Sequence, residues 1–229
     1  MDNLFRAAAI AAFGTLAALK PAAAMASDSQ IWTGGSVTVK LSPNWSLSQD
    51  ITARFSDNKH GLYELEANTL VGYQLSKTLS VWAGYDHDPQ YLGGHFTIME
   101  HRLVEHVVSS NLGKIAGGQL SGRIRLEQRW RDGQKGTGWR LRPYLRYTVP
   151  FSSRSKVGLT LSEEPFFDLN TTTFQRVHGL ERLRSLVAIT TPIGKHFSAD
   201  IGYMNQHGFV PHAKDTSDNI AYFALSLSL

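Results

Sequence analysis

The sequence predicts an all-β protein, an antiparallel up-and-down transmembrane β-barrel, and three observations support this. Apolar and polar residues alternate with a period of two along most of the chain, which places successive side chains on opposite faces of a strand. Short turns alternate with longer polar loops between these segments, as in outer-membrane barrels. The first residues have the composition of an export signal. We therefore expect the protein in the bacterial outer membrane, reached through the periplasm.

The export signal is predicted over residues 1–26. Arg6 supplies a basic start, residues 7–19 form a short apolar run, and residues 24–26 read Ala-Met-Ala, a small-residue cleavage site. The apolar run is shorter than the ~20 residues that a spanning helix needs. No later run is long enough either, so a membrane location requires strands. Residues 27–229 are predicted to form one barrel domain.

Composition excludes several classes of protein. The 23 basic residues are spread along the chain and nearly matched by 19 acidic ones, so no nucleic-acid partner is predicted. Cysteine is absent, which excludes disulfides, a thiol nucleophile and cysteine-ligated metals. The histidines show no ligand spacing beyond a weak grouping of His87, Asp88 and His95. No metal site and no cofactor are therefore predicted.

Residues 122–148 give the clearest strand pattern, because two charge-alternating segments face each other across one turn. An Arg or Lys on the lipid face costs ~2–4 kcal/mol at the membrane midplane, so the ionic face is expected to line the lumen. A small barrel has an interior barely wider than its side chains, which predicts a lumen filled by salt-bridged residues. The predicted lumenal charge ladder comprises Arg54, Glu64, Glu66, Arg123, Arg125, Glu127, Arg129, Arg140, Arg142, Arg146, Glu163, Arg182 and Asp200.

The strand count depends on residues 31–41. Counting from Trp45 to Leu229 gives ten strands, and including residues 31–41 gives eleven. Barrels of this class have even numbers of strands, so we predict ten, with twelve as the alternative and residues 31–41 as an accessory strand or plug. A secreted β-sandwich is the rival fold, because it also needs many short alternating strands.

Several strings in a fixed order resemble a family of bacterial outer-membrane barrels, the domain of unknown function 2490. They are Trp32, WSLSQDITARF, VGYQLS, WAGYDHD, EHRLVEH, RIRLEQRW, LRYTVPF, LSEEPFFDLN, ERLR and IGYMNQ, of which RLEQR at residues 125–129 and SEEPFFDLN at residues 162–170 are the most specific. The resemblance implies the fold and the location. It implies no activity and no catalytic residue. The chain departs from outer-membrane proteins in ending with Leu229 instead of an aromatic residue.

Three functions are compatible with these features. The first is a closed barrel with a structural or interaction role, carried by residues 164–178 and 207–218. The second is a small anion-preferring pore, motivated by the excess of lumenal arginine. The third is a lipid-modifying enzyme, for which His101 lies on the outward parity of its strand but has no serine to accompany it. Expected partners are outer-membrane lipid, lipopolysaccharide and, through the last strand, the barrel-assembly machinery.

The adjacent carboxylates Glu163 and Glu164 are not expected to form a catalytic pair. Glu163 and Glu164 are adjacent in a predicted strand, so their side chains point to opposite faces and form no dyad. Glu163 is the member predicted to pair with a lumenal arginine. The sequence therefore indicates no catalytic residue.

Overall fold

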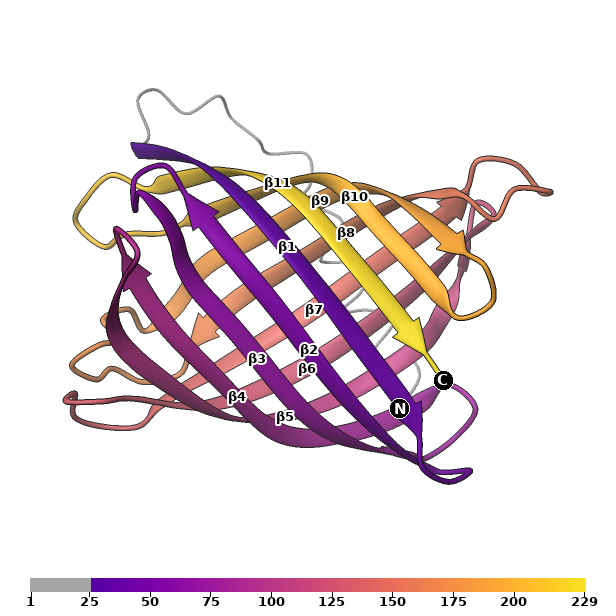
Figure 1. Ribbon diagram of the computed structural model, residues 1–229, viewed down its shortest axis with the longest axis horizontal. Helices are drawn as coiled ribbons and strands as arrows, with labels where there is room; N and C mark the ends of the chain where they lie inside the picture. The colour runs from indigo at the N-terminus through magenta and orange to yellow at the C-terminus, as the bar shows by residue number, and fades with distance from the viewer. Residues whose placement is uncertain (1–25) are drawn as a thin grey trace.

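The computed structural model describes residues 26–229, which form a closed barrel of strands joined in chain order (Figure 1). This confirms the predicted all-β barrel fold. The predicted export signal lies outside the described residues, apart from Ala26 at its boundary. No helix within residues 26–229 is long and apolar enough to cross a membrane.

The strands are β1 (Ala26–Lys40), β2 (Trp45–Ser56), β3 (Gly61–Gln74), β4 (Leu79–Leu92), β5 (His95–Ile115), β6 (Gly118–Arg131), β7 (Gly138–Pro150), β8 (Gly158–Asp168), β9 (Gly179–Ile193), β10 (Phe197–Gly208) and β11 (Thr216–Ser228).

The described barrel has eleven strands, against the ten predicted and the alternative of twelve. The difference lies in β1, which is an integral strand rather than an accessory one. It pairs antiparallel with β2 and parallel with β11, in register from Ala26 opposite Thr216 to Thr38 opposite Ser228. An odd number of up-and-down strands can close only through one parallel pair, because the first and last strands run in the same direction. The even-number expectation excluded such a pair.

The parallel seam between β1 and β11 is well bonded. The hydroxyls of Ser36 and Ser226 lie 3.0 Å apart across it, and the Lys40 amide donates to the Leu229 carbonyl at 3.0 Å. Figure 1 shows the two strands side by side, the indigo β1 next to the yellow β11, running in the same direction. The seam therefore closes the sheet along its whole length.

The connections define two ends of the barrel. One end, which we call the turn end, carries the connections at residues 41–44, 75–78, 116–117, 151–157 and 194–196. The opposite end, which we call the loop end, carries the connections at residues 57–60, 93–94, 132–137, 169–178 and 209–215. One connection of the loop end is short, because β4 and β5 are joined by a tight turn at Gly93 and Gly94. Their φ angles of 58° and 78° lie in the left-handed region that glycine adopts without strain.

The two faces of the wall differ as the alternation predicts. Ile31, Ile51 and Ile201 point outward and are about half exposed. Charged residues such as Arg54 and Glu66 are buried inside instead. The interior also holds an apolar cluster on the β9–β1 side, built from Trp32, Leu186, Ala188, Met204 and Ile220. The barrel is therefore apolar outside and mainly ionic inside.

Closure by β1 is testable with a disulfide, because the chain has no cysteine of its own. The double variant Ser36→Cys, Ser226→Cys should oxidise to a cross-linked form, since the native hydroxyls are 3.0 Å apart. Migration on a non-reducing gel measures the cross-link. The variant Ser36→Cys, Ser162→Cys is the control, because β1 and β8 are not neighbours. A ten-stranded barrel with β1 outside the sheet would give no cross-link in either variant.

Candidate functional site

Ionic side chains from β2 to β10 meet inside the barrel and form what we call the lumenal network. Its arginines are Arg54, Arg102, Arg123, Arg125, Arg129, Arg131, Arg140, Arg142, Arg146, Arg182 and Arg184, and its carboxylates are Glu64, Glu66, Asp86, Asp88, Glu100, Glu127, Glu164, Asp168, Glu181 and Asp200. All of the predicted ladder residues lie in this network except Glu163.

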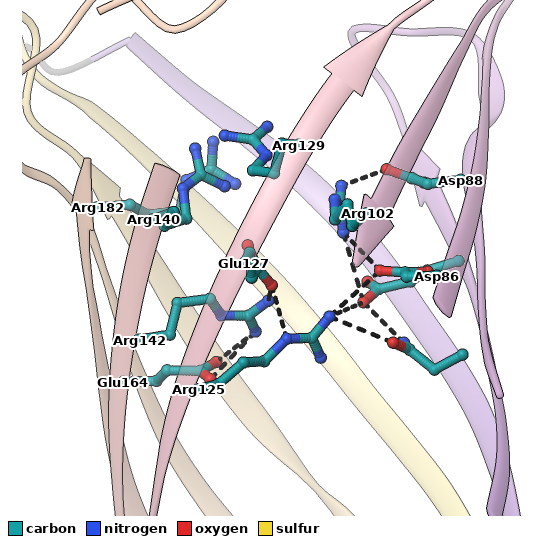
Figure 2. Close-up of polar contacts among 12 residues, drawn as sticks. Asp86, Asp88, Arg102, Arg125, Glu127, Arg129, Arg140, Arg142, Glu164 and Arg182 are labelled. Carbon is teal, nitrogen blue, oxygen red and sulfur yellow. Dashed lines mark hydrogen bonds and ion pairs between the residues drawn. The ribbon is translucent and has the colours of Figure 1, made fainter. Parts of the chain in front are cut away.

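Glu127 on β6 is one centre of the network. Its side chain is fully buried, at 0% exposure, and pairs with Arg125 at 2.7 Å and Arg142 at 2.6 Å. Arg125 extends across the lumen to Asp86 at 3.3 Å and to Asn68 at 3.2 Å (Figure 2). A single side chain thus connects β6 to β4 and β3, past the intervening strand β5.

Arg102 on β5 is the second centre. Its guanidinium bonds Asp86 at 2.9 Å, Glu100 at 2.6 Å and Asp88. These three carboxylates are at 0% exposure, and Glu66 lies 3.5 Å away. Burying several carboxylates together is costly unless cations are interleaved with them, and Arg102 supplies that cation.

The network continues around the barrel from these centres. Glu100 also binds Arg131 and, at 2.8 Å, Arg129. Glu164 on β8 accepts hydrogen bonds from Arg142 at 3.0 Å and from Arg123. Further pairs are Arg54 with Glu64 and Glu66, Arg140 with Asp168 at 2.7 Å, Arg146 with Asp200 at 2.8 Å and Arg182 with Glu181 at 2.9 Å. Ion pairs therefore connect strands from β2 to β10, some between neighbours and others between strands further apart in the sheet.

Two aromatic rings support the arginines. Phe166 on β8 is 1% exposed, and the guanidiniums of Arg142 and Arg184 lie 4.3 and 4.5 Å from its ring centroid. Arg184 also lies 4.5 Å from the ring of Trp32, and Arg54 lies 4.4 Å from it. A cation over an aromatic face is stabilised by the ring quadrupole, more so when both are removed from water. Arg184 lies against both rings, and its ion pair with Glu164 is long, at 3.9 Å.

Glu163 was predicted in the network, and the structure corrects this. It pairs in register with Ser185 of β9 and accepts a hydrogen bond from its hydroxyl at 2.9 Å. Its neighbour Glu164 occupies the interior position instead. The physical reason is the strand period, since the inward alternation through Thr160 and Ser162 continues unbroken to Glu164.

Several network members were not among the predicted ladder residues. Asp86 and Asp88 stand two apart on β4 and therefore share its inward face, and Glu100 and Arg102 do the same on β5. This spacing of two between charged residues was the available signal. It is harder to recognise where His87 and His101 lie between them and interrupt the apolar parity.

The network separates two cavities in the barrel. A cavity of about 410 Å³ at the loop end is lined by residues that include Arg131, Arg182 and Arg184. A second cavity of about 410 Å³ at the turn end is lined by Ser48 and Tyr144 among others, and the two linings share no residue. The fully buried side chains of the network lie between them.

One polar chain lies on the outside of the barrel, and we call it the outer-wall chain. The hydroxyl of Tyr85 on β4 is hydrogen-bonded to Nδ1 of His101 on β5. The other ring nitrogen of His101, Nε2, lies 3.3 Å from Asp132 Oδ1 in the loop after β6. His101 is 29% exposed and Asp132 is 69% exposed, so the chain is accessible. The structure places His101 on the outward face, as its parity predicted.

No group of three His, Asp or Glu residues within residues 26–229 is arranged to hold a metal ion. The weak grouping of His87, Asp88 and His95 is not brought together, because Asp88 is buried in the lumenal network while His87 pairs with His101 on the outer wall.

Comparison with known proteins gives three similarities. A family described as "Protein of unknown function (DUF2490)" matches residues 29–217. An uncharacterized protein of Methylorubrum extorquens is 28% identical over 161 residues, which cover 69% of each chain. Among solved structures, LpxR from Salmonella typhimurium is similar with a TM-score of 0.44 and 9% identity, over 80% of this chain and 83% of that one.

We expect Glu127, inside the lumenal network, to contribute more to the free energy of unfolding than Glu163, outside it. Glu127→Ala should lower the free energy of unfolding by about 3–5 kcal/mol, because it leaves two buried guanidiniums without their shared partner. Glu127→Gln, which keeps the shape and an acceptor oxygen, should lose less. Denaturant titration in detergent or vesicles measures both.

Glu163→Ala is the matched control for this comparison. It removes the same charge from the outer wall, where Ser185 is the hydrogen-bond partner, and should change the free energy of unfolding by less than about 1 kcal/mol. An equal loss for Glu127→Ala and Glu163→Ala would contradict a structural role of the network.

Proposed function

The chain belongs to DUF2490, a family of proteins of unknown function, and from that premise we propose that it is a closed outer-membrane β-barrel with a structural or interaction role. The observation that carries the proposal is the lumenal network, which fills the interior between the two cavities. The interaction role then belongs to the loop end, where residues 169–178 and 209–215 extend beyond the strands.

The distribution of polarity supports the membrane location. Large apolar side chains on every strand point outward, among them Ile51, Val187 and Phe223, each more than two-fifths exposed. Charged side chains are buried inside instead. This is the reverse of a protein surrounded by water, in which Arg, Asp and Glu are rarely fully buried, and it matches a wall that faces hydrocarbon. It also counts against the rival β-sandwich.

The charge balance argues against the anion-preferring pore. That hypothesis depended on an excess of arginine in the lumen. The network contains eleven arginines and ten carboxylates, and Asp28, Asp50 and Asp218 add carboxylates to the interior, each bonded to neutral side chains there. With the carboxylates counted, the arginine excess disappears.

Single-channel recording tests the closed barrel. The refolded protein in a planar bilayer should be silent, because ion-paired side chains fill the lumen between the cavities. The double variant Arg125→Ala, Arg142→Ala should show leak currents or lower stability, since it removes the two partners of Glu127. A steady anion-selective current in the unaltered protein would contradict the proposal and favour the pore.

A lipid-modifying enzyme is the second candidate, and the outer-wall chain favours it. Asp132 orients the His101 imidazole, whose Nδ1 is placed to accept the proton of the Tyr85 hydroxyl. This carboxylate–imidazole–hydroxyl order is the arrangement that activates hydroxyl groups for acid–base or nucleophilic chemistry. Because the chain lies on the outward wall, the bonds within its reach are those of membrane lipid.

Hydrolysis of phospholipid and lipopolysaccharide by the reconstituted protein tests this candidate. If the outer-wall chain is catalytic, fatty-acid release should fall by at least about 100-fold in Tyr85→Phe and in His101→Gln, the size of a lost acid–base group. His87→Gln is the control, since it changes a neighbouring ring 6.1 Å from His101. Absence of any release by the unaltered protein would remove the candidate.

A further inference from the structure

We propose that the turn end of the barrel binds anionic phospholipid headgroups through a ring of basic side chains, which we call the basic rim. The basic rim comprises Lys40, Lys77, Lys114, Arg154, Lys156 and Lys195. The inference rests on the proposed membrane location. It adds to that proposal the class of lipid that surrounds one end of the barrel.

The turn end carries side-chain charge of one sign only. Every connection at the turn end carries or adjoins at least one of its residues, and all six side chains are exposed. The turn segments 41–44, 75–78, 109–118, 150–158 and 193–197 contain no Asp or Glu. Among the described residues, these turn segments therefore carry cationic side chains and no acidic ones.

The loop end is the internal comparison. Its connections carry Lys59, Lys135, Arg176 and Lys214, but these alternate with Asp57, Asp132 and Asp215. The positive charge is therefore concentrated at one end of the molecule and nearly balanced at the other. A property of the whole protein, such as its basic pI, does not account for this difference between the ends.

The basic rim also lies at the depth of lipid headgroups. Outward aromatic residues lie next to it on the barrel wall, including Trp45 on β2 and Tyr73 on β3. Their ring centroids are 4.9 Å apart. Aromatic belts mark the membrane–water interface, and lysine stems extend along apolar surface so that the ammonium reaches water or headgroups. Cations directly beyond such a belt face the phosphate layer.

The cations of the basic rim are available for an external partner. Within residues 26–229, none of the six takes part in an ion pair, in contrast to the arginines of the lumenal network. They belong to five different turns around the circumference, so they do not converge on one small ligand. Many separate anionic headgroups in a leaflet fit this geometry, and each basic residue near such a surface strengthens binding by about fivefold, or ~1 kcal/mol.

Lipid selectivity in vesicles tests the basic rim. The protein is refolded into phosphatidylcholine vesicles with and without phosphatidylglycerol, and electron spin resonance compares the immobilised fractions of spin-labelled phosphatidylglycerol and phosphatidylcholine. We expect selectivity for phosphatidylglycerol that weakens at high salt. The rim variant Lys77→Gln, Lys114→Gln, Lys195→Gln should lose most of it, up to about fivefold at each position.

The matched control is the loop-end variant Lys59→Gln, Lys135→Gln, Lys214→Gln, which removes the same number of charges. Retained selectivity in this control supports the basic rim, whereas an equal loss in both variants would assign the effect to net charge and overturn the inference. Insertion into both vesicles without any selectivity would also overturn it, and would leave the proposed membrane barrel intact. Failure to insert into either vesicle would instead reject the membrane barrel and the basic rim together.

Discussion

The pairing of buried charge is the constraint on which the interior of this barrel depends. Glu127 has no exposure to solvent and is bound by Arg125 and Arg142, so removal of any one of the three leaves a charge in a medium that solvates it poorly. Because Arg125 also reaches Asp86 on β4, past the intervening strand β5, the same constraint ties strands that are not neighbours in the sheet.

An apolar cluster adjoins the ionic part of the interior. Trp32 and Ile220 lie inside the barrel near the seam, together with Leu186 and Met204, and the ring of Trp32 contacts the guanidiniums of Arg54 and Arg184. The strands that close the barrel, β1 and β11, thus contribute Trp32 and Ile220 to this apolar cluster. Strands β1 and β11 need no interstrand ion pair for this.

The alternation of residues predicted the strands, the face that each presents and nearly all of the lumenal ladder, because a period of two is a local property of the sequence. It failed where the information is not local. The parallel pairing of β1 with β11 joins residues about 190 positions apart, and nothing within residues 26–40 indicates the partner. The prediction of Glu163 as a lumenal residue was wrong, because the strand period that continues from Ser162 places Glu164 inside. Asp86 and Asp88 were missed because His87 lies between them and interrupts the apolar parity.

The parallel seam has a consequence for how the chain reaches its folded state. Every other pair of strands is joined by one connection and can form as a hairpin, whereas β1 must wait for β11, the last strand. Contacts of such sequence separation form late, because ordering the intervening chain precedes any gain from them. Until then the sheet has two free edges, which are templates for pairing with other chains. Closure of the seam is thus the step at which an aggregation-prone sheet becomes a barrel without edges.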